Sequence, residues 1–135
     1  MKNEFEPLVS VIILNYNAGN LLSECIESVL KTDYEKFEII IVDNDSKDDS
    51  VDRCKEKFRD VQIIENKKNL GYCEGNNVGI RNAKGEFIAI LNPDTVVDSN
   101  WLKELIKGYE IFGDGMYQPR FLTTDNHKIL QGTGN

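Results

Sequence analysis

The 135-residue chain carries 16 basic and 23 acidic residues, a formal net charge of −7, and is 40% hydrophobic and 29% charged. This composition is that of a soluble globular protein and excludes the disordered and collagen-like classes. Because an acidic chain is repelled by a phosphate backbone, we expect no nucleic acid partner. The length predicts a single domain, residues 1–135, with its own core.

The cysteines and the N-terminal residues favour a reducing, cytoplasmic setting. Cys25, Cys54 and Cys73 are isolated, odd in number and without C-x-x-C spacing, which argues against a disulfide framework or a zinc site. The first seven residues hold no apolar signal region, and no apolar run approaches the ~18 residues that span a bilayer. We expect a cytoplasmic protein, and peripheral attachment to the inner face of the membrane through a further part of the protein stays open.

The first part of the chain predicts strands alternating with helices. Residues 8–14 form an apolar, β-branched run, and the next segment has one helical face made by Leu22, Cys25, Ile26, Val29 and Leu30. Asn17 is a candidate cap of this helix. Residues 37–42 are apolar at consecutive positions, which is typical of a strand covered on both faces in a parallel sheet.

A second helix and a third strand follow. We expect Ser46 to cap the helix, with Asp49 near its third position and an apolar stripe made by Val51, Cys54 and Phe58. Residues 61–64 are predicted as the next strand. Residues 71–83 are rich in Gly and Asn and only weakly periodic, so we expect a loop that leads into a short helix.

The last strongly patterned elements are a strand at residues 87–91 and a long helix. We expect Asp98 or Ser99 to cap that helix, whose core-facing residues are Trp101, Leu102, Leu105, Ile106, Tyr109 and Phe112. Beyond Gly113 the pattern weakens.

Two short strands, at 116–122 and 128–131, are expected around a turn at 123–126. Four apolar strands alternating with helices predict the α/β class, with a doubly wound, mostly parallel sheet.

Polar residues follow all four predicted strands. In an open parallel sheet, ligands bind outside the carboxyl ends of the strands, near the point where the strand order reverses. Any one of these turns has the ordinary composition of loops and caps. Four together favour a ligand crevice lined by Asn15-Tyr16-Asn17, Asp43-Asn44-Asp45-Ser46, Glu65-Asn66 and Asn92-Pro93-Asp94-Thr95.

The residue types in this crevice suit a nucleotide. The Asp43 carboxylate can accept hydrogen bonds from a base or from ribose hydroxyls. The first turn, residues 14–20, lacks both G-x-G-x-x-G and the P-loop pattern, which argues against dinucleotide and P-loop triphosphate binding. Gly71 and Gly75 can let a loop approach a diphosphate closely, although a plain turn explains them equally well.

Asp94 is the candidate metal ligand. Its carboxylate follows the fourth strand in a turn stiffened by Pro93, where it can bind a hard divalent ion, Mg²⁺ or Mn²⁺, that also takes phosphate oxygens. Such an ion would neutralise a diphosphate that the acidic crevice otherwise repels, and would stabilise it as a leaving group.

These residues resemble the inverting glycosyltransferases of family 2, which have a GT-A fold. Order and spacing agree over roughly residues 8–112. The similar segments are Val9-Ser10-Val11-Ile12-Ile13-Leu14-Asn15-Tyr16-Asn17, Ile41-Val42-Asp43-Asn44-Asp45-Ser46 with Ser50, Asn69-Leu70-Gly71-Tyr72, Gly75-Asn76-Asn77-Val78-Gly79-Ile80, and Gly85-Glu86-Phe87-Ile88-Ala89-Ile90-Leu91-Asn92-Pro93-Asp94.

The resemblance implies roles for individual residues. Asn15, Asn17 and Asp43 would contact the base and ribose of the donor, and Asp94 would be the metal ligand of the family's D-x-D motif. The first Asp of that motif is replaced by Asn92, a form similar to that of rhamnosyl-type transferases that make bacterial polysaccharides. The predicted set of residues that bind the nucleotide sugar is completed by Asp45, Gly71, Asn77 and Asn92.

The resemblance also implies a reaction and a missing part. Family members are roughly twice this length, and their catalytic base lies in the half that is absent here, beyond residue 135. We therefore expect a truncated donor domain that binds a UDP- or dTDP-sugar, whose complete form transfers the sugar with inversion to a glycan acceptor. An apolar face normally covered by the missing half would leave self-association open.

Two other function classes stay open at this stage. A nucleotidyltransferase-like enzyme would usually carry a basic, glycine-rich first loop, and residues 15–20 contain no Lys or Arg. A non-catalytic nucleotide-binding or interaction module would share the fold without the chemistry, which fold resemblance alone does not exclude.

Overall fold

The computed structural model describes residues 5–118, 121–122 and 129–130. The four longer strands form a parallel sheet in the order β3-β2-β1-β4, and β5 and β6 form a separate antiparallel pair. This arrangement confirms the α/β class and the parallel sheet. The elements in chain order are β1 Val9–Asn15, α1 Asn20–Leu30, β2 Phe37–Asp43, α2 Ser50–Lys57, β3 Gln62–Glu65, α3 Gly71–Asn82, β4 Phe87–Leu91, α4 Trp101–Phe112, β5 Phe121–Leu122 and β6 Ile129–Leu130.

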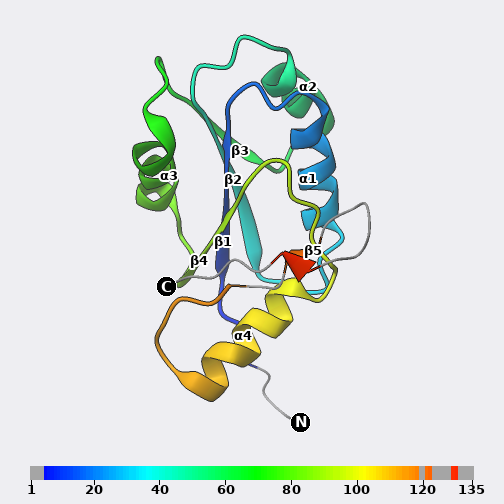
Figure 1. Cartoon of the computed structure of the whole chain (residues 1–135), viewed down its shortest axis with the longest axis vertical. Coiled ribbons are helices and arrows are strands. Elements are labelled where there is room, and N and C mark those ends of the chain that lie inside the picture. Colours follow the sequence, from blue (N-terminus) through cyan, green and yellow to red (C-terminus); the bar gives the residue numbers. More distant parts are fainter. Residues whose placement is uncertain (1–4, 119–120, 123–128, 131–135) are drawn as a thin grey trace.

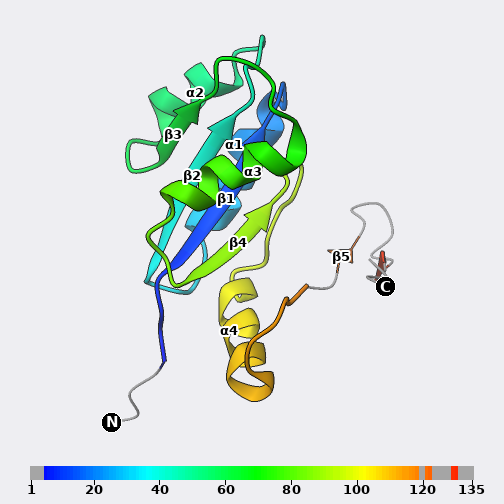
Figure 2. The same ribbon diagram turned by 90° about the vertical axis from the view of Figure 1, so that its left-hand side faces the viewer.

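Helices cover both faces of the sheet. Figure 1 shows α1 and α2 on one side and α3 on the other, and Figure 2 shows α3 lying across the sheet. Alternate residues of each strand therefore enter two cores. The larger core joins Val11, Ile13, Ile39 and Ile41 to α1, α2 and α4, and the smaller one joins Ile12, Ile40 and Val42 to α3.

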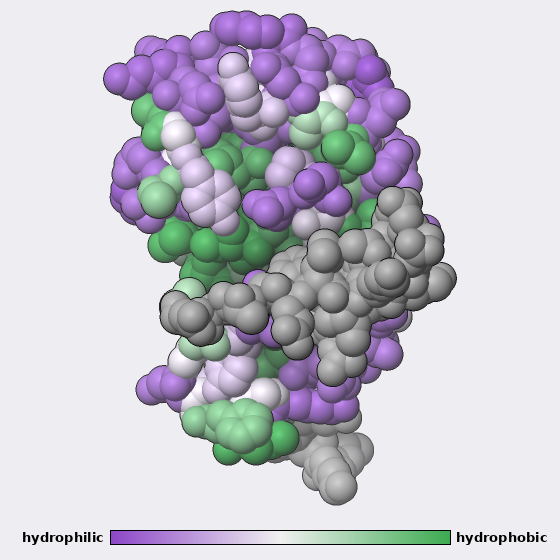
Figure 3. All heavy atoms as spheres, in the orientation of Figure 1, coloured by the Kyte–Doolittle hydropathy of each residue, from purple (hydrophilic) through white to green (hydrophobic). Residues whose placement is uncertain are grey.

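The strand order places a switch point between β1 and β4. The chain moves from β1 through β2 to β3 and then crosses to the other side of β1 to form β4. In doubly wound sheets a crevice opens at such a reversal, outside the carboxyl ends of the strands. Those ends lie at the upper edge in Figure 1, where Figure 3 shows a largely hydrophilic surface.

One face of the edge strand β4 is exposed. Ile88 and Ile90 are 41% and 44% exposed, whereas their neighbours on β1 are buried. Within the described residues, α3 lies over β1 and β2 and leaves this face open. Figure 3 shows apolar surface across the middle of the same view. The continuous apolar pattern of residues 87–91 therefore forms a strand, as expected, but one that is not covered on both faces.

The segment 71–83 was expected to begin as a loop and is helical from its first residue. Gly75 and Gly79 lie on the side of α3 that faces the sheet, where a Cβ atom would come within 2.6 Å of Leu14 Cδ1 and of Ile12 Cγ2 respectively. The helix therefore packs through small residues rather than through an apolar stripe, so hydrophobic periodicity in the sequence does not reveal it.

Three expected helix caps are wrong. α1 begins after Gly19 rather than Asn17, α2 begins after Asp49 rather than Ser46, and α4 begins after Asn100 rather than Asp98 or Ser99. In each case the expected side chain accepts from another group. The Asn17 and Ser46 side chains bond within the polar edge of the sheet, and Asp98 Oδ1 accepts from the Asn100 amide at 2.9 Å.

The region after α4 is only partly described. Residues 116–118 are not part of a strand, so the first expected short strand is limited to Phe121–Leu122, and the second is seen as Ile129–Leu130. The predicted turn at 123–126 lies outside the described residues. Trp101 is buried as expected, whereas Tyr109 is half-buried in a ring cluster with Phe5 and Phe87. In the described part of the chain, no helix has both the length and the apolar character that a membrane span requires.

The contact between α3 and the sheet can be tested at Gly79. We expect Gly79→Ala to destabilise the protein by about 1–2 kcal/mol, because overpacking costs more than the better helix propensity of alanine returns. Asn82→Ala, at the exposed end of the same helix, is the matched control and should stay within about 0.5 kcal/mol of the parent. Urea unfolding with an unchanged m-value measures both. A Gly79→Ala variant as stable as the control would contradict this packing.

The buried Cys54 thiol should make the free energy of unfolding fall as the pH rises into the alkaline range. Burial raises the pKa of Cys54 from 9.0 to about 11, so the folded chain keeps a proton that the unfolded chain has lost between these values. The contribution of Cys54 to the free energy of unfolding is therefore complete below pH 9.0 and declines as the pH rises toward 11. Urea unfolding of the parent and of Cys54→Ala at pH 8 and pH 10.5 should show the difference between them narrowing. A constant difference would rule out this titration.

Candidate donor-binding site

A buried hydrogen-bond network lies where β1 and β2 end. Asn15 and Asp43 are direct partners in the parallel register, and Asn15 Nδ2 donates to Asp43 Oδ1 at 2.8 Å. The same Nδ2 donates to Ser50 Oγ at 2.9 Å, while Ser46 Oγ donates to Asp43 Oδ1 at 2.6 Å. Asn15 is fully buried and Asp43 is 4% exposed. This pair therefore joins two strands to the start of α2 beneath the surface of the crevice.

Asn17 joins the two loops above this network. Its φ of 51° lies in the left-handed region, which Asn tolerates better than most residues. Asn17 Oδ1 accepts from the Lys47 amide at 2.7 Å and from the Asp48 amide at 3.3 Å. The Asn17 amide in turn donates to Ser46 Oγ at 2.9 Å. The exposed Asn17 thus holds the loops after β1 and β2 against each other.

Acidic side chains occur on both sides of this contact. Asp45 also has a left-handed backbone, with φ 62°, and pairs with the exposed Lys47 at 2.9 Å. Burial tends to raise the pKa of Asp48, but hydrogen bonds from Ser50 and from the Gly19 amide outweigh it and lower that pKa. The carboxylate of Asp48 is therefore ionised and fixed, whereas Asp45 presents its charge at the edge of the crevice.

Asn44 is a central residue of this edge, which the sequence places in the crevice without predicting a donor contact for it. It is 2% exposed and faces α3, where its Nδ2 donates to the Gly71 carbonyl at 3.1 Å. Its Oδ1 accepts from Asn66 Nδ2 at 3.0 Å and from the Leu70 amide at 3.4 Å. Asn44 thereby holds the loop after β3 and the first turn of α3, including Gly71, beside the end of β2. Its only signal in the sequence was its place directly after an apolar strand.

Asn92 and Asp94 occupy a turn at the other side of the switch point. The Thr95 amide donates to the Asn92 carbonyl at 3.1 Å, which closes a turn with Pro93 at its second position, where proline is favoured. Asn92 and Asp94 are both exposed. Among the described residues, no hydrogen bond or ion pair engages the Asp94 carboxylate, so its oxygens are available to a ligand.

The side chains of this edge suit a cation that takes part of its ligands from a bound diphosphate. The described residues contain no group of three or more His, Cys, Asp or Glu side chains that could hold a metal ion by themselves. Mg²⁺ and similar hard ions commonly use one or two carboxylates and take their remaining ligands from phosphates and water. The single available carboxylate of Asp94 meets the minimum of one carboxylate, so the phosphates and water would supply the other ligands.

Two of the predicted donor-site residues, Gly71 and Asn77, lie on α3. Gly71 begins the helix with a φ of 80°, which glycine adopts without strain. Asn77 is exposed, and its Nδ2 donates to Glu74 Oε2 at 3.4 Å. Its neighbour Asn76 is buried instead. Among the described residues, the Oδ1 atoms of Asn76 and Asn15 are buried without a hydrogen-bond partner, a state that an ordered water or a ligand donor would relieve.

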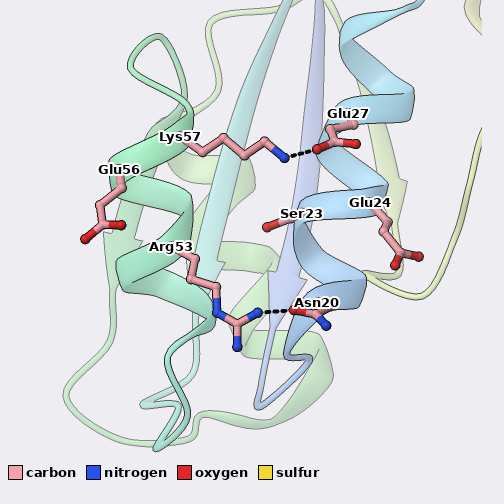
Figure 4. Close-up of a pocket in the computed structure, with 7 residues that line it drawn as sticks. All are labelled: Asn20, Ser23, Glu24, Glu27, Arg53, Glu56 and Lys57. Atoms are coloured by element: carbon pink, nitrogen blue, oxygen red, sulfur yellow. Dashed lines mark hydrogen bonds and ion pairs between the residues drawn. The ribbon is translucent and has the colours of Figure 1, made fainter.

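A separate hollow between α1 and α2 does not belong to this site. It has a volume of about 520 Å³ and is lined by Asn20, Ser23, Glu24, Glu27, Arg53, Glu56 and Lys57. Figure 4 shows Arg53 bonded to Asn20 and Lys57 bonded to Glu27, so both cations already have partners across the hollow. We therefore assign no ligand to it.

Comparisons with known proteins agree on one family. The model of the family described as Glycosyl transferase family 2 matches residues 10–128. Glycosyltransferase GlyG of Streptococcus pneumoniae is 37% identical over 101 residues, which cover 73% of this chain and 34% of GlyG. An uncharacterized glycosyltransferase of Haemophilus influenzae is 32% identical over 103 residues, covering 74% of this chain and 32% of that protein. The chain spans about a third of the length of these relatives.

Solved structures share the fold. The mannosyltransferase PcManGT from Pyrobaculum calidifontis, in complex with GDP-Man and Mn²⁺, matches with a TM-score of 0.71 at 27% identity, covering 78% of this chain and 33% of that chain. S. aureus TarS 1-349 in complex with UDP-GlcNAc matches with a TM-score of 0.70 at 25% identity, covering 82% and 37%. The GT-A fold expected from the sequence is thereby confirmed.

The buried amide of Asn15 can be tested against the exposed amide of Asn17. We expect Asn15→Asp to destabilise the chain by about 3–5 kcal/mol at pH 7.5, because it buries a second carboxylate against Asp43. Lower pH should relieve part of the loss, since one of the two carboxyl groups then takes up a proton. Asn17→Asp should change stability little, because a carboxylate accepts the same two amide bonds. Urea unfolding at pH 5 and pH 7.5 measures the stability of both variants. An equal loss of stability in Asn15→Asp and Asn17→Asp would contradict the buried network.

Proposed function

The chain belongs to the family 2 glycosyl transferases, and from this premise we propose that it is the donor-binding part of an enzyme that transfers a sugar from a nucleoside diphosphate carrier. The observation that carries the proposal is the exposed Asp94 carboxylate beside the switch point, which has no hydrogen bond or ion pair among the described residues. The nucleotide sugars bound to PcManGT and TarS support a donor of the same chemical class.

The polar edge divides into a nucleoside side and a diphosphate side. We assign base and ribose to the loops after β1 and β2, where Asn17 and Asp45 are reachable and Asn15 and Asp43 hold those loops from beneath. We assign the diphosphate and the sugar to the turn of Asn92 and Asp94 and to the start of α3 at Gly71. Asn77, whose side-chain amide bonds to Glu74, has the weakest support of the predicted donor contacts.

Asp94 would hold a divalent cation, Mg²⁺ or Mn²⁺, together with the donor diphosphate. When bound, such a cation supplies charge neutralisation of the diphosphate and stabilises it as a leaving group. The chain needs this help, because its net charge is −7 and its polar edge is rich in carboxylates. The Asn92 amide, in place of a second carboxylate, can orient a phosphate or sugar hydroxyl without adding negative charge.

The remaining steps belong to parts of the enzyme outside these residues. We propose transfer with inversion to a glycan acceptor, in the synthesis of a polysaccharide or another cell-surface glycan. The general base that takes the acceptor proton would lie beyond residue 135, and such a base contributes roughly 10²–10⁴ to the rate. The free cysteines Cys25, Cys54 and Cys73 fit a reducing, cytoplasmic setting for this reaction.

The proposed function predicts metal-dependent binding of a nucleoside diphosphate. Titration calorimetry with UDP, dTDP and GDP, each with and without Mn²⁺, should show tighter binding of the preferred nucleotide when the metal is present. Asp94→Ala should reduce the affinity to the metal-free value. Asp60→Ala, which removes an exposed carboxylate at the opposite edge of the sheet, is the control and should bind like the parent. Equal affinity with and without Mn²⁺ in the parent chain would contradict the role of Asp94.

A further inference from the structure

The C-terminal half of helix α1 and the residues just after it contact the segment that carries Asp94. Cys25 Sγ donates to the Asn92 carbonyl at 3.7 Å, and the Val97 amide donates to Ser28 Oγ at 3.1 Å. Trp101 Nε1 donates to Thr32 Oγ1 at 2.9 Å. Cys25, Ser28 and Thr32 recur at helical spacing, so they lie along one face of the helix and its end. This row of polar groups follows residues 92–101 from the turn to the start of α4.

The groups in this row are fixed within the protein. Cys25 is fully buried and Ser28 is 8% exposed. Ser28 Oγ also donates to the Cys25 carbonyl at 2.7 Å, so the hydroxyl has one donated and one accepted bond and a single orientation. Beyond the helix, the Asp33 amide donates to the Ser99 carbonyl at 2.8 Å. Breaking the part-buried bond between the Val97 amide and Ser28 Oγ has a cost, because an amide that loses its acceptor there is not fully compensated by water.

Asp94 lies between two of these attachment points. The Asn92 carbonyl precedes it and the Val97 amide follows it. Burial, with a smaller contribution from the Asp94 charge, raises the pKa of the Cys25 thiol to about 12. The segment itself lacks regular structure between β4 and α4 and exposes Asn92, Asp94 and Val96. Its position therefore depends on the contacts to α1 rather than on a ladder of its own.

The geometry points to Ser28 and Cys25 as positioning residues that hold the Asn92–Val97 segment on α1, so that the Asp94 carboxylate is presented to a cation and diphosphate at the switch point. This inference rests on the proposed function. It adds two residues of α1 that contact no ligand themselves. Removing such support for a ligand of a metal ion typically lowers metal affinity about 10–100-fold.

The chain offers matched controls for both residues. Ser10 is a fully buried serine whose Oγ accepts from the Gly85 amide at 2.8 Å and donates to Glu38 at 2.6 Å, an arrangement like that of Ser28 but at the opposite edge of the sheet. Cys54 is a fully buried cysteine in the same core, on α2. Ser10→Ala and Cys54→Ala therefore reproduce the loss of stability without touching the Asp94 segment.

The experiment compares Ser28→Ala and Cys25→Ala with these controls by calorimetry, using UDP, dTDP and GDP with and without Mn²⁺, and by amide hydrogen exchange of the metal-free chain. We expect Ser28→Ala and Cys25→Ala to weaken Mn²⁺-dependent nucleotide binding about 10-fold, with metal-free binding unchanged. The Val97 amide of Ser28→Ala should exchange faster. Ser28→Thr, which keeps the hydroxyl, should restore both properties, and the two control variants should bind like the parent.

Several results would overturn the inference, and they differ from a failure of the proposed function. Parent-like binding of metal and nucleotide by Ser28→Ala would overturn it. An equal loss of affinity in Ser10→Ala, or an equal loss in Ser28→Ala with and without Mn²⁺, would also overturn it, because either result indicates general damage to the fold. If the parent binds nucleotide without any metal dependence, the role of Asp94 itself is wrong and the positioning role falls with it. Fast Val97 exchange in the parent chain would overturn the attachment independently of any ligand.

Discussion

The parallel register of β1 with its two neighbours is the constraint on which the site depends. β1 pairs with β2 from Val9 to Asn15, and with β4 from Val9 to Ile13, so all three strands run in one direction and end at one edge. Asn15 therefore meets Asp43, and Asp43 meets Glu65 on the next strand. A shift of one residue would turn these side chains to the other face of the sheet and separate the pair.

This register lets a fully buried polar pair exist next to two apolar cores. The Asn15 amide has acceptors in Asp43 and Ser50, and the backbone of β2 continues the connection, since the Asn44 amide donates to the Asn15 carbonyl at 2.9 Å and the Asn66 amide donates to the Asp43 carbonyl at 2.8 Å. The ends of three strands and the start of α2 are thus joined by hydrogen bonds. The exposed loops above them can carry ligand-facing groups because these hydrogen bonds anchor the bases of the loops.

Helix α1 connects the two sides of the switch point. Its apolar residues Leu22, Ile26 and Val29 pack on the sheet, while Cys25 and Ser28 bond to the segment after β4. The same helix follows directly from the loop that holds Asn17. In the proposed function, the nucleoside side and the metal side of the donor site would therefore keep a fixed separation, set by one rigid element rather than by the loops.

The sequence by itself determined the strands, the class of fold and the polar edge. Consecutive apolar residues in β1, β2 and β4 and the polar residues that follow them are local features, and the matching family segments supported the same reading. Burial of a polar residue is not local. The end of an apolar strand predicts a donor contact for Asp43, and the family resemblance implies one for Asn15. Only the tertiary structure shows that the two side chains bond to each other beneath the loops.

Tertiary contacts also decided the elements that the sequence analysis misplaced. α3 extends through Gly71–Asn82 because Gly75 and Gly79 fit against Leu14 and Ile12 of the sheet, and glycine by itself disfavours a helix. Ser46 and Asn17 are ordinary capping residues whose side chains bond across the loops instead. Cys25 belongs to the apolar face expected for α1, and nothing local distinguishes Ser28, yet their contacts lie 67 and 69 residues away along the chain. A pattern over neighbouring residues records propensity and periodicity, whereas the partner of a buried polar group is chosen by the packing of distant segments.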